Sequence, residues 1–233
     1  MYLNTSLLQD VIHLVYPHQC NGCGSDLLER KELLCTHCIK SLPHTDFAKL
    51  KNNMIEGIFS GRLDIEAAHS EFYFSKGQLI QHLIHQLKYK NNQEIGFYLG
   101  ALMGKTLMKS ERFEQTHLLI PLPMHKEKEI KRGYNQATVI ANGIASIMQI
   151  PVLPQVIIRN RLAETQTQKH RAERWKNVAD SFVIANKESI KGKNVLLIDD
   201  VITTGATLEA CGKTILEIEG TQLSIATLAL ASK

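Results

Sequence analysis

Thirteen residues near the C-terminus decide the fold of this chain: Val195-Leu-Leu-Ile-Asp199-Asp200-Val-Ile-Thr203-Thr204-Gly205-Ala206-Thr207. An apolar run, typical of a buried strand, leads into two adjacent acids and then into a small, hydroxyl-rich loop that opens a helix. Ligands of open α/β sheets bind at the carboxyl ends of strands, where this loop falls. Free amides at a helix N-terminus favour an anion. The stretch therefore predicts a phosphate site on an α/β sheet.

Each part of the stretch has its own chemical reason. Gly205 lets the backbone approach a ligand, and the threonine hydroxyls add donors. Asp199 and Asp200 can accept hydrogen bonds from ribose hydroxyls, directly or through Mg²⁺. TTGAT alone also fits a threonine-capped helix with two acids near its positive end. The complete order of strand, acids, loop and helix is more specific, and the chain has no GxxxxGK[ST] sequence that would indicate a P-loop.

Strand and helix patterns alternate on both sides of this stretch, which favours βαβ units, a parallel sheet flanked by helices, and the α/β class. The expected strands are 72–74, 117–122, 152–158, 195–198 and 223–230, and the expected helices are 79–87, 95–108, 134–148 and 206–218. Residues 44–66 contain several Asn and Gly residues and have little apolar pattern, so they are interpreted as a linker or joining loops. We expect residues 1–60 to hold an N-terminal helix (5–15), a cysteine segment and this linker, and residues 61–233 to form the larger domain.

Four of the five cysteines have the spacing C-x2-C-x11-C-x2-C, at Cys20, Cys23, Cys35 and Cys38. Two such pairs can close a tetrahedron of thiolates around one Zn²⁺ with no open position, so the metal is expected to be structural. Two disulfides or a redox pair are the alternative, but disulfides need an oxidising compartment. Cys211 stands alone in an apolar helix pattern and is interpreted as a core residue.

The composition of the chain restricts the class of protein and the ligands that it can bind. The chain has 233 residues, 44% hydrophobic and 21% charged, with a net charge of +4. These values exclude wholesale disorder, and the mild positive charge permits phosphorylated ligands or nucleic acid without requiring them. No apolar run is long enough to span a membrane, and the N-terminus lacks a basic signal region, so we expect a cytoplasmic protein without membrane insertion.

The thirteen residues resemble the phosphoribosyl pyrophosphate (PRPP) signature of type I phosphoribosyltransferases. The resemblance implies that Asp199 and Asp200 hold the ribose and that Thr203, Thr204, Gly205, Ala206 and Thr207 hold the 5-phosphate, with Mg²⁺ accompanying PRPP. Purine-salvage members carry a further Asp where this chain has Thr203, so general-base catalysis on a purine is not supported.

Further blocks carry a second resemblance: the four cysteines, Leu87-Lys88-Tyr89, Ile120-Pro-Leu-Pro, Lys131-Arg132-Gly133-Tyr134-Asn135-Gln136, and Arg159-Asn-Arg161 through Asn177-Val178. Together they make the chain similar to the ComF family, which is associated with DNA uptake in natural transformation. The resemblance places residues 121–125 beside the diphosphate. It makes Lys88, Arg132, Asn135 and Gln136 donor candidates there. Tyr134 fits either base stacking or the core.

The basic segment 159–176 has two interpretations that the sequence does not separate. In related transferases this region closes over PRPP, and its charge equally suits a DNA backbone, with Trp175 available for stacking. The resemblance implies a competence protein that handles incoming single-stranded DNA in the cytoplasm, together with DNA-uptake or recombination proteins, and has a PRPP site. The alternative is an active phosphoribosyltransferase with an unknown acceptor.

Overall fold

The structure is a computed structural model, which describes residues 18–26, 28, 32–75, 77–159 and 182–231. It separates into two compact units, Met1–Leu42 and Pro43–Lys233. The division falls nearer the N-terminus than the expected boundary at residue 60. The helix expected over 5–15, Trp175 and all of the basic segment except Arg159 lie outside the described residues.

Backbone hydrogen bonds around the cysteines organise the N-terminal unit. Cys20 N donates to Ser25 O over 2.8 Å, and Gly24 N donates back to Cys20 O over 2.9 Å, which closes a tight turn. Helix α2 (Thr36–Lys40) begins directly after Cys35, whose sulfur accepts a hydrogen bond from the amide of Cys38. Leu34, fully buried, precedes it. Turn and helix thus present their cysteines from short, well-bonded segments.

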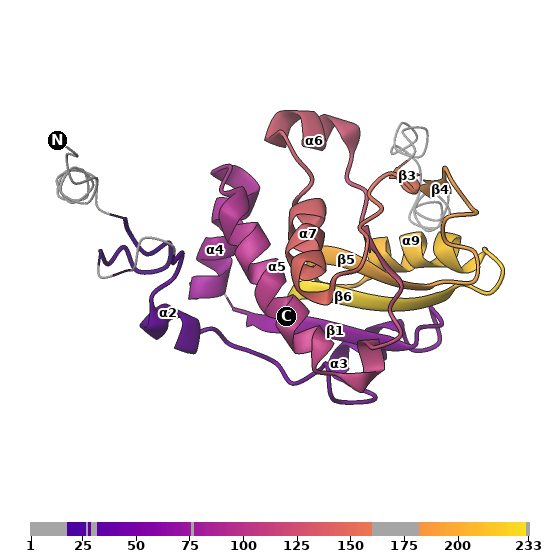
Figure 1. The fold of residues 1–233 in the computed structure, drawn as a ribbon, viewed down its shortest axis with the longest axis horizontal. Coiled ribbons are helices and arrows are strands. Elements are labelled where there is room, and N and C mark those ends of the chain that lie inside the picture. The colour runs from indigo at the N-terminus through magenta and orange to yellow at the C-terminus, as the bar shows by residue number, and fades with distance from the viewer. Residues whose placement is uncertain (1–17, 27, 29–31, 76, 160–181, 232–233) are drawn as a thin grey trace, which may run out of the picture. The chain divides into compact units, whose positions relative to one another are not determined.

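A four-stranded sheet forms the centre of the second unit (Figure 1). Its strands lie in the order β1 (Ala67–Phe74), β6 (Gln222–Ala231), β5 (Asn194–Ile202) and β2 (Leu118–Pro121), and all neighbours are parallel. Parallel neighbours need crossover connections, which the helices between them supply. The expected α/β fold with a parallel sheet flanked by helices is confirmed.

Alternating strand residues bury both faces of the sheet. On one face, strand residues share a core with helices α3 (Met54–Phe59) and α9 (Ala206–Leu216). That core includes Leu118, Ile120, Val195, Leu197, Leu223, Ile225, Phe59, Leu208 and Cys211. The intervening residues Leu119, Leu196 and Ile198 are equally buried and point to the other face. Helix α7 (Gln136–Met148) packs on β2 and β5, and α5 (Gln93–Met108) packs along α7.

Glycines set the close approach of α5 and α7. A Cβ atom on Gly100 would lie 2.3 Å from Ile140 O, and one on Gly143 would lie 2.2 Å from Phe97 O. Both distances are far inside van der Waals contact, so only glycine permits the observed crossing. Helix α4 (Leu79–Tyr89) precedes α5 and buries Ile80, Leu83, Ile84 and Leu87. The apolar stripe expected over 79–87 is therefore a helix.

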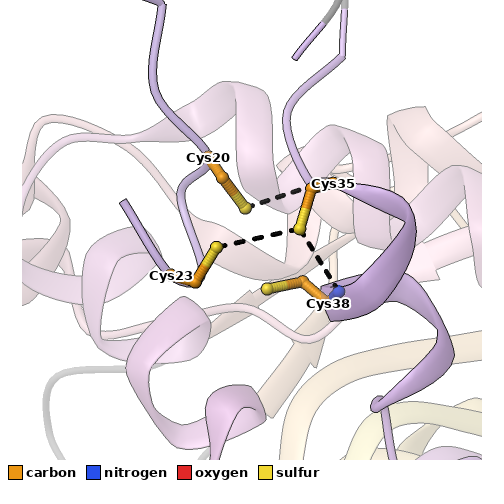
Figure 2. A group of neighbouring side chains, drawn as sticks. All are labelled: Cys20, Cys23, Cys35 and Cys38. Atoms are coloured by element: carbon orange, nitrogen blue, oxygen red, sulfur yellow. Dashed lines mark hydrogen bonds between the residues drawn. The ribbon is translucent and has the colours of Figure 1, made fainter. Parts of the chain in front are cut away.

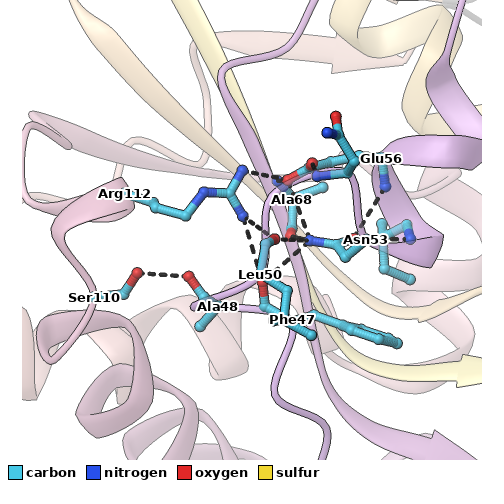
Figure 3. Close-up of polar contacts among 10 residues, drawn as sticks. Phe47, Ala48, Leu50, Asn53, Glu56, Ala68, Ser110 and Arg112 are labelled. Atoms are coloured by element: carbon cyan, nitrogen blue, oxygen red, sulfur yellow. Dashed lines mark hydrogen bonds and ion pairs between the residues drawn. The ribbon is translucent and has the colours of Figure 1, made fainter.

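Residues 44–60, part of the segment 44–66 interpreted from the sequence as a linker or joining loops, are folded into the second unit. Phe47, Ile55 and Phe59 lie in its core. Asn53 caps α3 and donates to Ala68 O on β1 over 2.9 Å (Figure 3). The Arg112 guanidinium forms an ion pair with Glu56 and donates to Leu50 O over 2.6 Å. Polar residues that suggest a loop in the sequence are thus used for capping and bridging.

Several element bounds differ from those expected. Strand β1 starts at Ala67, five residues before the expected start at Phe72, because its polar residues His69, Ser70 and Glu71 are buried rather than exposed. The strand expected over 152–158 is reduced to β3 (Ile157–Arg159), which pairs antiparallel with β4 (Phe182–Ile184). Strand β2 is preceded by the 3-10 helix η1 (Glu111–Phe113) and followed by a short helix, α6 (Lys126–Arg132).

Within the described residues, no helix is both long and apolar enough to cross a bilayer.

Candidate functional site

The four spaced cysteines converge in the N-terminal unit (Figure 2). Their sulfur atoms all lie within 4.8 Å of one another, and the Sγ atoms of Cys23 and Cys35 are 3.7 Å apart. Four sulfurs bound at about 2.3 Å from one zinc ion would be about 3.8 Å apart. All five cysteines of the chain are free thiols. The cluster therefore fits a tetrahedral metal ion such as zinc.

Backbone amides that donate to sulfur stabilise negative charge in this cluster. Cys35 N and Gly22 N donate to the Cys20 sulfur over 3.2 and 3.4 Å. Burial raises the pKa of Cys20, but these amides and that of Cys23 outweigh it and bring the pKa to about 6. Burial and the neighbouring sulfurs raise the pKa of Cys38. Four thiols this close cannot all ionise without a cation, which is the electrostatic setting of a thiolate metal site.

The loop between β5 and α9 lies at the carboxyl end of β5, as predicted. Thr203 and Thr204 are exposed, and Gly205 adopts the left-handed conformation with φ of 72°. A side chain on Gly205 would be strained and would lie 2.9 Å from Ile58 Cγ2. Helix α9 begins at Ala206, so Ala206 and Thr207 stand in its first turn, where backbone amides are free of intrahelical partners.

Lys88 from the end of α4 reaches the acids of this strand. Its Nζ lies 3.0 Å from Asp200 Oδ2, and Asp200 is only 4% exposed. Asp200 N donates to Asp199 Oδ1 over 2.8 Å. Two adjacent carboxylates and one ammonium group thus lie together at the end of β5, where the hydroxyl groups of a sugar could bind.

Asp199 has an unusual proton affinity. Burial raises its pKa to about 8, and the charge of Asp200 acts in the same direction, against the backbone amide of Asp200 and the positive charges of Lys88 and Arg159. A protonated Asp199 can donate a hydrogen bond as well as accept one. A cation or a set of hydroxyl donors at this carboxyl would favour its ionised form.

The predicted donors of the diphosphate region come from two neighbouring segments, the end of α4 and residues 132–136. These two segments are called the wall of the site. Tyr134 OH donates to Leu87 O, which joins the turn before α7 to the end of α4. The Arg132 guanidinium carbon lies 5.8 Å from the centre of the Tyr89 ring, and Arg132 also donates to Gln136 Oε1. The structure therefore brings Lys88 and the segment 132–136 together, although they are far apart in the sequence. Tyr134 is buried, as its core interpretation requires.

Asn135 is held differently from its neighbours. Its Oδ1 accepts from Ala137 N over 2.9 Å, and its Nδ2 donates to Leu122 O over 3.0 Å. These bonds cap α7 and fix the loop after β2, which makes Asn135 a positioning residue for the wall. Cys211 is fully buried, and burial raises its pKa, which fits a core role rather than a nucleophile.

Arg62 and Glu209 are two site residues that sequence reasoning missed. Arg62 follows α3, donates to Thr204 O over 3.3 Å and forms an ion pair with Glu209 in the first turn of α9. A lone arginine in a segment interpreted as linker carries no local signal of such a role. Only the fold brings residues 62 and 209 together.

A family model described as a phosphoribosyl transferase domain matches residues 135–233, which include the β5–α9 loop and the Asn135–Gln136 turn. A solved B. subtilis glutamine PRPP amidotransferase, in complex with ADP and GMP, is 20% identical with a TM-score of 0.41, covering 57% of this chain and 25% of that chain.

Curated relatives extend the similarity beyond that domain. Competence protein F of Haemophilus influenzae is 26% identical over 216 residues, covering 91% of this chain and 84% of that protein. Competence protein ComFC of Bacillus subtilis is 27% identical over 158 residues, covering 67% and 61%. DNA utilization protein YhgH of Escherichia coli K12 is 25% identical over 129 residues, covering 54% and 56%. The chain thus spans about three fifths of the last two proteins.

The cysteine cluster precedes the parallel sheet, and strands β5 and β6 of that sheet lie within the residues that match the phosphoribosyl transferase domain. The similarity to Competence protein F covers 91% of the chain. The chain is therefore similar to competence proteins of the ComF family over most of its length.

Proposed function

We propose that this protein is a ComF-type competence protein that binds PRPP, or a related phosphoribosyl ligand, with Mg²⁺ at the β5–α9 loop. The observation that supports it most is the arrangement at the end of β5. There Asp199, Asp200 and Lys88 lie beside a threonine-rich loop that opens a helix. Acids for a ribose, amides for a phosphate and a cation for a diphosphate are the groups that such a ligand needs.

The parts of the ligand divide among the parts of the site. The 5-phosphate would bind the amides and hydroxyls of residues 203–207, and the ribose hydroxyls would bind the two acids. The diphosphate would lie toward Lys88 and Arg132, with Gln136 orienting the guanidinium. Mg²⁺ would neutralise diphosphate charge and would be held by the diphosphate together with Asp199 or Asp200.

The metal of the N-terminal unit is proposed to be structural Zn²⁺. Four cysteine ligands leave no position for a substrate. For a unit this small, metal binding supplies much of the folding free energy.

The proposed cellular role is the handling of incoming single-stranded DNA in the cytoplasm, with DNA-uptake or recombination proteins as partners. It rests on the relatives named for competence and DNA utilization and on the chain's mild positive charge. Binding of a fluorescent single-stranded oligonucleotide, measured over a range of salt concentrations, tests it. A linear loss of affinity with salt supports phosphate contacts, and absence of binding at low salt contradicts the DNA role.

Calorimetric titration of Mg²⁺-PRPP into the zinc-loaded protein tests the ligand site. One-to-one binding, competed by ribose 5-phosphate, is the expected result. Absence of heat and of competition would mean that the motif serves only as scaffold.

Phosphoribosyl transfer is a second candidate function. The two adjacent acids at the end of β5 favour it, because carboxylates there would orient the ribose and disperse the positive charge that develops at its C1. In such a reaction an acceptor would displace pyrophosphate from C1 of the ribose. A coupled assay for pyrophosphate release, run with nucleobases and amines as acceptors, tests this function.

A further inference from the structure

The phosphate loop rests on a segment that the proposed function does not use. Gly205 lies directly against α3, since a Cβ atom there would be 2.9 Å from Ile58 Cγ2 and 3.0 Å from Phe59 Cε1. Arg62 follows α3 at the turn made by Gly61. The floor of the loop is therefore built by residues 58–62.

Arg62 joins this floor to the loop and to helix α9 through one guanidinium group. Its Nη1 donates to Ile58 O over 2.9 Å and to Thr204 O over 3.3 Å, and its Nη2 forms the ion pair with Glu209. The side chain is one third exposed, so it is not simply buried filling. One planar fork thus connects α3, the loop and the first turn of α9.

The bond to Thr204 O controls the direction of the next amide. In a trans peptide the C=O and N–H groups point in opposite directions. Because Arg62 holds the Thr204 carbonyl toward α3, the Gly205 N–H is directed away from α3. That amide belongs to the group at the start of α9 that the proposed function assigns to the 5-phosphate.

The ion pair with Glu209 solves an electrostatic conflict. Glu209 stands in the first turn of α9 with its side chain 9% exposed, where an uncompensated charge would repel a phosphate. Burial raises the pKa of Glu209, but hydrogen bonds from Lys213 and Arg62 outweigh it and hold the pKa below its usual range. Lys213 Nζ lies 2.7 Å from Glu209 Oε1 and is the second counterion.

We propose that Arg62 is a positioning residue of the phosphate loop, which orients the Thr204–Gly205 peptide and cancels the charge of Glu209 so that the start of α9 attracts phosphate. The proposal rests on the proposed function of this loop and adds its support. Arg62 touches the loop and not the ligand.

Four variants separate the two roles: Arg62→Gln, Glu209→Gln, their combination, and Arg112→Gln as the matched control. Arg112 also pairs with a glutamate and donates to backbone carbonyls, but it lines a cavity of about 190 Å³ with Asn194, the first residue of β5. The loop follows the last residue of that strand. Arg112→Gln therefore removes the same kind of interaction at the other end of β5.

Affinity for ribose 5-phosphate and for pyrophosphate is measured with the zinc-loaded full chain. Arg62→Gln should weaken ribose 5-phosphate by about tenfold or more and leave pyrophosphate within about twofold. Glu209→Gln should bind ribose 5-phosphate as well as the parent or better, and the double variant should fall between Arg62→Gln and the parent. Arg112→Gln should leave both affinities unchanged. Equal losses in Arg62→Gln and Arg112→Gln, or a Glu209→Gln loss as large as that of Arg62→Gln, would overturn the proposal.

Hydrogen exchange without ligand gives an independent measurement. Amides of residues 203–207 should exchange faster in Arg62→Gln and not in Arg112→Gln, and unchanged exchange in Arg62→Gln would overturn the positioning role. If the parent protein binds neither phosphate ligand, the proposed function fails. The exchange comparison then still decides whether Arg62 orders the loop.

Discussion

The cysteine cluster and the β5–α9 site differ in how much of the chain builds them. The cluster comes from Cys20 to Cys38 alone, with one half on a turn and the other at the start of helix α2. The second site combines Lys88, the 132–136 turn and the end of β5, and its floor adds Arg62, 147 residues before Glu209. A site built from one short segment depends on its ligand for order, whereas a site built from distant segments inherits its order from the fold. The two sites should therefore respond differently to substitution.

The largest expected effect is at the cysteine cluster. Cys20→Ser should release zinc and unfold the N-terminal unit, because thiolate zinc sites of this size contribute about 10–16 kcal/mol of binding free energy at pH 7. Zinc content by elemental analysis and far-UV circular dichroism measure this. Cys211→Ala, which changes a buried core cysteine, is the control and should keep its zinc. Full zinc content in Cys20→Ser would contradict the four-thiolate site.

Substitution of the acids should have the opposite character: loss of ligand without loss of fold. Asp199→Asn combined with Asp200→Asn should weaken Mg²⁺-PRPP binding by more than about a hundredfold, since both ribose acceptors are changed. Glu219→Gln, at an exposed surface ion pair, is the control. Calorimetry and a thermal unfolding curve measure binding and fold separately. Normal PRPP binding by the double variant would show that the ligand site lies elsewhere.

The same contrast explains which features could be predicted from the sequence. The cysteine cluster and the order of strand, acids and loop could be predicted because each depends on neighbours in the chain, and the parallel sheet follows from the alternation of strand and helix patterns. The role of residues 44–60 could not be predicted from the sequence. Helix α3 has only six residues, and its cap Asn53 and neighbour Gly57 resemble loop residues. Arg62 and Tyr134 acquire their partners only when distant helices meet.

For the four predicted diphosphate donors, the sequence indicates the group but not the role of each residue. Lys88, Arg132, Asn135 and Gln136 were grouped by resemblance, and the structure does bring them to one wall. It also separates their roles in a way that no spacing could show. Lys88 faces Asp200, whereas both polar ends of Asn135 bind within the chain.

A pH titration sharpens the comparison with a smaller effect. Ligand groups that bind the ionised form of Asp199 must displace its proton below a pKa of about 8. PRPP affinity should therefore rise about tenfold between pH 7 and pH 9, with about one proton released per ligand at pH 7. Calorimetry at pH 7 in buffers of different ionisation enthalpy counts that proton. An affinity that is flat over this range, with no proton release, would contradict the assignment of Asp199 to the ligand.

The free energy of unfolding should also depend on pH, because folding raises the pKa of Asp199. The pKa of Asp199 is raised above its ordinary value of 3.8, so folding favours its protonated form. Its contribution to stability is complete below pH 4 and is lost as the pH rises toward 8. Asp199→Asn should accordingly raise the thermal midpoint relative to the parent at pH 9 and not at pH 4. A gain of equal size at both pH values would mean that Asn packs better for a reason unrelated to charge.

The smallest expected effect tests how the wall of the second site is shared. Tyr134→Phe removes only the hydroxyl that donates to Leu87 O. A single such bond contributes about 1 kcal/mol, so the thermal midpoint of the second unit should fall by about 2–4 °C and zinc content should not change. Pyrophosphate affinity should fall only about two- to threefold, because Lys88 remains paired with Asp200 and Arg132 remains on Tyr89 and Gln136. A loss above about tenfold would mean that this one bond, rather than several, holds the wall in place, and the order of the assembled site would then be as locally determined as that of the cysteine cluster.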